Sequence, residues 1–214
     1  MSDDSAVIPA RGRDILGRRA SGDRDPTVKL YDFKRPDKFS KEQVRTVEII
    51  HETFARLSST SLSAQLRLPC DMSLKLVDQL TYQEFMDTLS APMVLGAFTA
   101  KPWEGMALFH FDTELREALL ERSFGGVVGP VDPVIASREL TDLEHSVLSG
   151  LMQPLLGNFG TAWEQIETLE PELRTVETDP RFCQIVPPTE MVLLVGFEVK
   201  ISDRVGRLHL VIPY

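Results

Sequence analysis

Two long segments of the chain carry apolar residues at helical spacing. The first stripe is Val44, Val47, Ile50, Phe54 and Leu57, and the second is Leu143, Val147, Leu151, Leu155, Phe159 and Trp163. A capping box precedes each stripe, at Ser40–Gln43 and Thr141–Glu144: the hydroxyl accepts the third backbone N–H, and the third side chain reaches back. The pattern predicts two long helices, each with one buried face. Pro154 should kink the second helix.

Shorter apolar runs between and after these helices predict strands. Met72–Leu76 alternates as a half-buried strand does. The other predicted strands are Met93–Phe98, Met106–Phe111, Glu172–Glu177, Met191–Val195 and Gly206–Ile212. Thr81 to Leu89 is predicted to be a short helix or a turn, opened by a cap between Thr81 and Glu84. Ser58–Ser61 extend the first long helix with small residues, which fits either a close approach of a second helix or a solvated face.

The middle of the chain is a glycine loop. Asp112–Arg122 has the spacing of a short helix, and Gly125 and Gly126 follow it as a stop signal, because glycine takes positive φ without a Cβ penalty. Pro130 and Pro133 should forbid a new helix nearby. We therefore expect residues 124–130 to form a pinned, exposed loop.

The two halves on either side of this loop resemble each other. At an offset of 99 residues, Val94 meets Leu193, Phe98 meets Phe197 and His110 meets His209; the capped helices match at an offset of 101. We therefore predict a helix–strand–helix–strand–strand unit used twice. The fold class is α/β, a duplicated layered domain with pseudo-two-fold symmetry and a central sheet covered by long helices.

Charge and composition narrow the range of partners. The chain has 214 residues, 43% hydrophobic and 26% charged, with a net charge of −9. Residues 1–40 carry +2, so the remainder carries −11. An acidic body argues against a nucleic-acid partner, which would call for clustered Lys and Arg. No apolar run reaches the ~20 residues that cross a bilayer, so we expect a cytoplasmic protein without membrane insertion.

Residues 1–39 lack periodicity and are rich in Arg, Asp, Gly and Pro, which predicts a flexible leader. Within it, Tyr31–Pro36 should dock on the body in extended form. Cys70 and Cys183 are too few for a disulfide framework or a metal site and are interpreted as buried free thiols.

Each candidate for chemistry has a structural alternative. His110 and His209 occupy equivalent strands and could bind a metal as a pair, but apolar neighbours favour partly buried histidines that face a covering helix. His51 and His145 look like solvent-side or boundary residues. The carboxylates at 114, 117 and 121, and at 164, 167 and 170, are typical of solvated helix faces.

No nucleotide or nucleophile motif is present. Gly-x-Ser-x-Gly is absent. Gly125, Gly126 and Gly129 follow a helix and lead into proline, whereas phosphate-binding glycines follow a strand and open a helix. We predict no cofactor and no metal, and a turn that presents its backbone to another protein.

Several segments resemble the FliM family of flagellar motor switch proteins. They are Tyr31–Gln43, Ile50–Leu57, Asp78–Phe85, Phe124–Gly126 and Gln184–Val192, and the resemblance covers about residues 29 to 214. It implies that residues 40–214 are a FliM-like middle domain with a CheC-like fold. Its halves would be about 40–123 and 140–214, joined by the loop 124–139.

The resemblance also implies a function. The chain would be a non-enzymatic part of the switch, at the cytoplasmic face of the inner membrane in the flagellar basal body. Its partners would be FliG, neighbouring FliM subunits, phosphorylated CheY and FliN. The residues that match the FliG-contact motif, with its flanks, are Phe124, Gly125, Gly126, Gly129 and Pro130.

The sequence departs from the family pattern in three places. Val127 and Val128 separate the glycines by one residue more than the usual Gly-Gly-x-Gly. The family's N-terminal CheY-binding segment is missing, and Asp14–Leu16 is too weakly similar to it to take that role. The chain stops at Tyr214, where the family continues into a FliN-like domain, so we expect that domain and FliN binding through it to be missing.

Two alternatives stay open. A CheC-type phosphatase of phospho-CheY needs a Glu and an Asn one helical turn apart, to orient the attacking water. Here Glu52 is followed by Ala55 and Glu144 by Val147, so negligible activity is expected. An unrelated small-molecule enzyme has no residues in its favour and stays open only because fold does not fix function.

Overall fold

The structure is a computed structural model that describes residues 40–89 and 93–214. The helices are α1 (Lys41–Leu66), α2 (Tyr82–Thr88), α3 (Thr113–Ser123), α4 (Pro133–Ala136) and α5 (Asp142–Trp163). The strands are β1 (Cys70–Thr81), β2 (Val94–Lys101), β3 (Ala107–Phe111), β4 (Glu170–Glu177), β5 (Met191–Ile201) and β6 (Arg204–Pro213), with a 3-10 turn η1 (Pro180–Phe182). The predicted leader, with Tyr31–Pro36 and Asp14–Leu16, lies outside the described residues.

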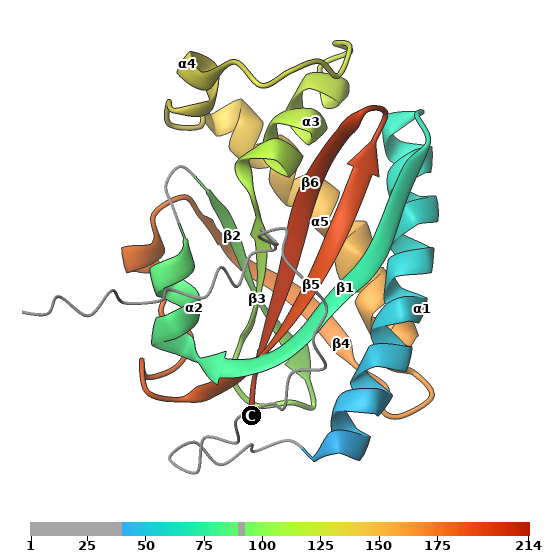
Figure 1. Ribbon diagram of the computed structural model, residues 1–214, viewed down its shortest axis with the longest axis vertical. Coiled ribbons are helices and arrows are strands. Elements are labelled where there is room, and N and C mark those ends of the chain that lie inside the picture. Colours follow the sequence, from blue (N-terminus) through green and yellow to red (C-terminus); the bar gives the residue numbers. More distant parts are fainter. Residues whose placement is uncertain (1–39, 90–92) are drawn as a thin grey trace, which may run out of the picture. The chain divides into compact units, whose positions relative to one another are not determined.

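The six strands form one antiparallel sheet in the order β1-β5-β6-β3-β2-β4 (Figure 1). This order is unchanged when β1 is exchanged with β4, β5 with β2, and β6 with β3. The two halves meet between β3 and β6, where His110 pairs with His209 at the predicted offset of 99 residues. The predicted duplicated α/β fold is confirmed.

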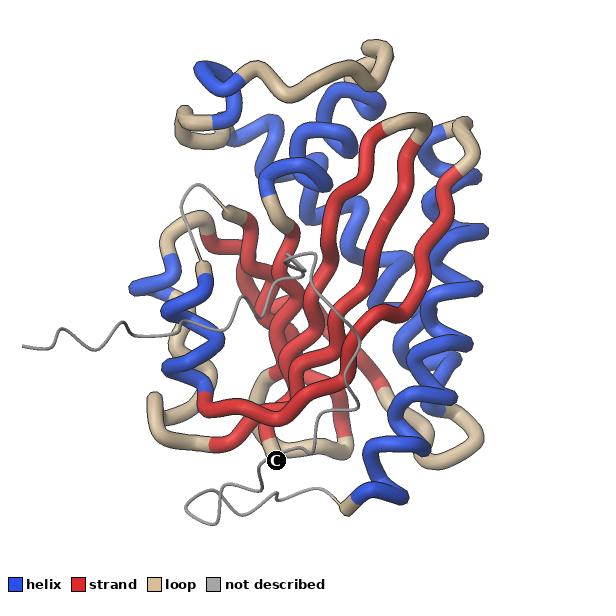
Figure 2. The backbone as a smooth tube through the Cα atoms, in the orientation of Figure 1, coloured by secondary structure: helices blue, strands red, loops and turns tan. Residues whose placement is uncertain are grey.

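Two layers cover the sheet. Successive strand residues point to opposite faces. On one face, Phe109 stacks on Phe54 of α1 with ring centroids 6.1 Å apart. On the other face, His110 contacts Phe85 of α2 at 6.1 Å. The long helices α1 and α5 thus lie on one face and α2 on the other, while α3 and α4 lie at one end of the sheet (Figures 1 and 2).

The predicted helix starts are confirmed. Ser40, Thr81 and Thr141 each form a complete capping box, for α1, α2 and α5. Helix α5 continues as one helix through Pro154. Leu143, which we expected in its buried stripe, is 64% exposed, because it lies in the first turn beyond the edge of the packed face.

Helices α1 and α5 approach closely at the small residues of α1. The Asn158 amide of α5 donates to the hydroxyl of Ser58 at 3.3 Å and to that of Ser61 at 3.0 Å. Of the two alternatives for Ser58–Ser61, helix–helix contact is therefore the one that the structure bears out. On the other side of α1, Ser59 accepts the N–H of Met72 at 2.8 Å, so α1 also satisfies part of the edge of β1.

The predicted strand at Met72–Leu76 is confirmed but is longer than expected, and the prediction that no new helix begins near Pro133 was wrong. Strand β1 runs from Cys70 to Thr81 and not only over residues 72–76, because a bulge between Leu74 and Leu76 breaks the alternation that marks a strand. A helix does begin again after the glycine loop: Pro133 occupies the first position of α4, capped by Asp132. Proline is tolerated there because that N–H needs no partner within the helix.

Candidate functional site: the glycine loop

Helix α3 ends in a Schellman motif built on two glycines. The Gly125 N–H donates to the Arg122 carbonyl at 3.0 Å, and the Gly126 N–H donates to the Glu121 carbonyl at 2.8 Å. Gly125 has φ +84°, a left-handed conformation that penalises any residue with a Cβ. At Gly126 the limit is space, because an added Cβ would lie 2.9 Å from the Glu121 carbonyl oxygen. Each glycine is therefore required for its own physical reason.

Side chains at the end of α3 hold the loop to the body. The Arg122 Nε donates to the Leu66 carbonyl at the end of α1, at 2.8 Å. Glu121 accepts the N–H of Gly129 at 3.3 Å and pairs with Arg204 of β6 at 3.3 Å. These contacts tie the loop to α1 and to the sheet.

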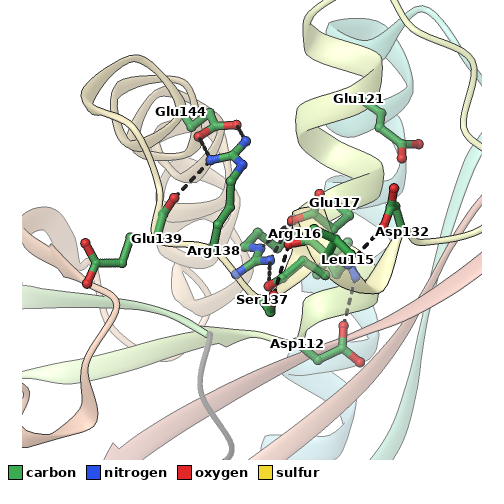
Figure 3. Close-up of polar contacts among 12 residues, drawn as sticks. Asp112, Leu115, Arg116, Glu117, Glu121, Asp132, Ser137, Arg138, Glu139 and Glu144 are labelled. Atoms are coloured by element: carbon green, nitrogen blue, oxygen red, sulfur yellow. Dashed lines mark hydrogen bonds and ion pairs between the residues drawn. The ribbon is translucent and has the colours of Figure 1, made fainter.

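The next part of the segment is fixed by a buried arginine. Arg116 of α3 is 1% exposed; its Nη2 donates to the Ala136 carbonyl at 2.7 Å, and its Nε donates to Glu117 at 2.7 Å (Figure 3). A buried charge is costly unless it is paired and hydrogen-bonded. Glu117 and Ala136 supply partners for Nε and Nη2, whereas Nη1 is buried without one, and the bond to Ala136 holds α4 against α3. The prediction that Glu117 lies on a solvated face was wrong, since it is 6% exposed.

A second ion pair connects the segment to α5. Arg138 binds both carboxylate oxygens of Glu144, which also accepts the Thr141 N–H at 2.8 Å in the capping box (Figure 3). The hydrogen bonds from Arg138 are the main reason that the pKa of Glu144 falls to about 2. The segment from Gly125 to Glu144 is thereby fixed at both ends and in the middle.

The segment nevertheless exposes large apolar side chains. Phe124, Val127, Val134 and Ile135 are 52%, 90%, 78% and 47% exposed. We call these four residues, with the backbone of Gly125 and Gly126, the glycine-loop surface; it lies at the end of the sheet where Figure 1 shows α3 and α4. Exposed apolar residues held on a fixed backbone are typical of a protein-binding surface.

Three of the five predicted site residues, Phe124, Gly125 and Gly126, belong to this surface, and Gly129 and Pro130 follow it in the same loop. Phe124, Gly125, Gly126 and Pro130 are exposed, and Gly129 is half-buried. Whether they contact a partner stays a prediction. Sequence reasoning missed Val134 and Ile135. The sequence does contain a signal for them. Val134 and Ile135 are two adjacent β-branched residues directly after Pro133, in a segment too short to form a strand.

The histidines have structural roles. The Nδ1 atoms of His110 and His209 lie 3.0 Å apart, so one ring donates and the other accepts. Burial is the main cause that lowers the pKa of both, that of His209 to about 4. The two rings face each other, and His110 also faces Phe85 of the covering helix α2, as predicted. Within residues 40–89 and 93–214, no three His, Cys, Asp or Glu side chains form a group that could hold a metal ion.

His51 was assigned wrongly from the sequence. It is fully buried, its Nδ1 bonds the Val47 carbonyl at 2.8 Å, and burial lowers its pKa to about 4. It contacts Phe54 and Trp163 in the core, so its polar ring is enclosed by aromatic residues. His145 is half-buried, as predicted for a boundary residue, and bonds the Val176 carbonyl at 2.7 Å.

The carboxylates that a phosphatase would need are not arranged for it. Glu52 is exposed on α1, with Ala55 one turn later. Glu144 is 8% exposed, and its carboxylate accepts hydrogen bonds from the Arg138 side chain and the Thr141 N–H. Neither carboxylate has an amide side chain three residues on with which to position a water.

Comparison with known proteins identifies the family. Residues 40–214 match the sequence profile described as "Flagellar motor switch protein FliM". The chain belongs to the FliM family. It is 46% identical over 187 residues to FliM of Treponema pallidum (strain Nichols), which corresponds to 87% of this chain and 54% of that protein. It is 35% identical over 192 residues to FliM of Bacillus subtilis (strain 168), over 90% and 57% of the two chains. The chain spans about half the length of these FliM relatives.

Solved structures agree with this assignment. FliM in a crystal structure of a FliG–FliM complex from H. pylori superposes with a TM-score of 0.78 and 27% identity, over 82% of this chain and 94% of that one. Thermotoga maritima FliY, at 18% identity and a TM-score of 0.71, shares the fold. No helix in the described residues of this FliM-family chain has the length and apolar character to span a membrane.

Proposed function

We propose that this chain is the middle domain of a non-enzymatic flagellar motor switch component, in the ring at the cytoplasmic face of the inner membrane. In this role it binds FliG, stands beside neighbouring FliM subunits and relays the phospho-CheY signal that sets the direction of rotation. Contact with FliN would involve parts of the protein other than residues 40–214.

The observation that carries the proposal is the glycine-loop surface. Its backbone is fixed by Arg116, Arg122 and the Schellman hydrogen bonds, yet Val127 is 90% exposed. A rigid surface pays little conformational entropy on binding, and apolar side chains at its centre supply the free energy. The similar FliM from H. pylori was crystallised in a complex with FliG, which supports FliG as the partner.

The contact itself we assign to Phe124, Gly125, Gly126, Gly129 and Pro130, together with Val127. The exposed glycines let a partner approach the backbone without a side chain in the way. Phe124 and Val127 flank them with apolar area.

The proposal is tested by measuring FliG binding to the purified chain by titration calorimetry. Val127→Glu changes a side chain that the fold does not use, because 90% of it is exposed. We expect this variant to bind FliG at least tenfold more weakly while its thermal stability stays within about 0.5 kcal/mol of the parent chain.

The matched control is Ile49→Glu on α1. Ile49 is 59% exposed and lies outside the glycine-loop surface, so this variant should bind FliG as the parent does. Equal affinities for the parent and for Val127→Glu would contradict the assignment of this surface to FliG. If both variants lost FliG affinity equally, the loss would not be specific to the glycine-loop surface, and the assignment would fail.

A further inference from the structure

The C-terminal end of α1 lies at the same end of the sheet as α3 and the glycine loop (Figure 1). This 26-residue helix ends at Leu66, and its C-cap residue, Arg67, takes the left-handed conformation with φ +51°. The last carbonyl groups of a helix have no partner within the helix and need one from elsewhere. The end of α1 therefore depends on donors from other elements.

One side chain of α3 supplies donors to this helix end. The Arg122 guanidinium donates through Nε to the Leu66 carbonyl at 2.8 Å and through Nη2 to the Arg67 carbonyl at 3.4 Å. The last turn of α1, every residue of which the structure describes, contains no basic side chain. A cation at a helix C-terminus also interacts favourably with the helix dipole. Arg122 thus completes the end of α1 from outside the helix.

Arg122 is also joined to the glycine turn. Its carbonyl accepts the Gly125 N–H at 3.0 Å, and its Nη1 lies 3.5 Å from the Gly126 carbonyl oxygen. The guanidinium is planar and holds its N–H donors in fixed relative directions. A shift of the α1 carbonyls therefore moves this group and the turn attached to it.

A serine near the end of α1 fixes the carbonyls that Arg122 binds. The Ser63 hydroxyl accepts the Cys70 N–H at 2.9 Å, and the Ser63 carbonyl accepts the Leu68 N–H at 3.3 Å. Ser63 thus holds the turn between α1 and β1 through its side chain and its backbone. Arg67 lies within that turn, so Ser63 sets where its carbonyl meets the guanidinium.

We propose that Arg122 is a positioning residue that couples the end of α1 to the glycine-loop surface, so that a displacement of α1 changes the affinity for FliG. The FliG readout of this inference rests on the proposed function. Arg122 acts by placing the backbone of Gly125 and Gly126. A partner that shifts α1 would regulate the FliG contact from outside the glycine-loop surface.

A double-mutant cycle, measured by calorimetric titration of FliG into the purified chain, tests the coupling. Ser63→Ala loosens the turn after α1. Arg122→Lys keeps the positive charge but replaces the planar guanidinium with a single ammonium group, which cannot hold several carbonyls in fixed geometry. Two sites that act independently change the binding free energy additively, so a departure from additivity measures the link between them.

We expect Ser63→Ala to weaken FliG binding by roughly threefold in the parent chain and to have no further effect in the Arg122→Lys variant. Arg122→Lys alone should weaken FliG binding by at least the same factor. The domain should stay folded in both variants, because each substitution removes hydrogen bonds at the edge of the core and leaves the apolar packing intact.

The matched control is Ser59→Ala. The Ser59 hydroxyl accepts the Met72 N–H at 2.8 Å, so it makes the same kind of bond between α1 and β1, one helical turn further from the carbonyls that Arg122 binds. Ser59→Ala should lower the thermal stability about as much as Ser63→Ala does and leave the FliG affinity unchanged. A general loss of stability would affect the two serine variants alike.

Exchange of the Gly126 amide hydrogen, measured by NMR without FliG, tests the coupling separately from the proposed function. This N–H donates to the Glu121 carbonyl at 2.8 Å. Ser63→Ala should accelerate its exchange in the parent chain but not in the Arg122→Lys variant. If the parent chain does not bind FliG, the proposed function fails and this exchange decides the coupling. Additive effects of the two substitutions, or an equal effect of Ser59→Ala, would overturn the proposal.

Discussion

Gly125→Ala should separate the stability of the glycine loop from its binding role. Gly125 has φ +84° and no atom within 4 Å of an added Cβ, so the substitution causes backbone strain without a steric clash. Holding a residue with a Cβ in the left-handed region costs roughly 1–2 kcal/mol. Restricting the unfolded chain returns roughly 0.4–1 kcal/mol. The net loss of unfolding free energy should be about 1 kcal/mol, which lowers Tm by roughly 2–4 °C for a domain of this size.

Gly105→Ala is the matched control. Gly105 lies in the turn between β2 and β3 with φ +87°, and again no atom lies within 4 Å of an added Cβ. The same arithmetic therefore gives the same loss of stability at the other end of the sheet. The two variants differ only in whether the strained turn belongs to the glycine-loop surface.

The assay is urea unfolding of both variants combined with titration of FliG. Both should lose about 1 kcal/mol of stability, but only Gly125→Ala should bind FliG more weakly. If the loop opens to relieve the strain, it must close again to bind FliG. A strain of about 1 kcal/mol then weakens the affinity for FliG about fivefold. Unchanged FliG affinity with the expected loss of stability would refute the view that the Schellman turn preorganises this surface.

Three further results are expected. Asn158→Ala removes the hydrogen bonds to Ser58 and Ser61 that join α5 to α1, so urea unfolding should show a loss of about 1–2 kcal/mol. Burial lowers the pKa of His51 and His209 to about 4, so the folded chain binds fewer protons than the unfolded chain between pH 6.5 and 4. Unfolding free energy should fall by about 1.4 kcal/mol per pH unit per histidine as pH drops through that window, and His51→Leu should reduce this slope. Adding the chain to phospho-CheY should leave its rate of dephosphorylation unchanged, because Glu144 is held by Arg138; faster decay would argue for the phosphatase alternative.

The elements that sequence reasoning found are those with a local cause. The capping boxes at Ser40 and Thr141 place each hydroxyl three residues from its backbone donor, so they are visible in four consecutive letters. The duplication is visible because the offset of 99 residues is kept across two turns, and it brings His110 opposite His209 in the sheet. Local rules and the repeat together account for most of the fold.

What sequence reasoning missed depends on contacts between distant residues. His51 was predicted to be a solvent-side or boundary residue because most of the rings that enclose it, Phe159, Trp163 and Phe197, are more than a hundred residues away in the sequence. Glu117 was assigned to a solvated face because its partner, Arg116, resembles any other helix-surface arginine. Only the approach of Ala136, twenty residues away, makes that arginine a buried anchor.

The glycine-loop surface lies where the chain passes from one half of the repeat to the other. The residues from Phe124 to Arg138 join the two halves and are not part of the paired strands and long helices. Arg116, Arg122 and Arg138 hold this segment to the body, so its apolar side chains stay exposed on a fixed backbone. The sheet and the long helices of each half bury their apolar side chains against each other, whereas the connecting segment needs only a few polar contacts to keep its shape. Its exposed apolar side chains are therefore available to a partner.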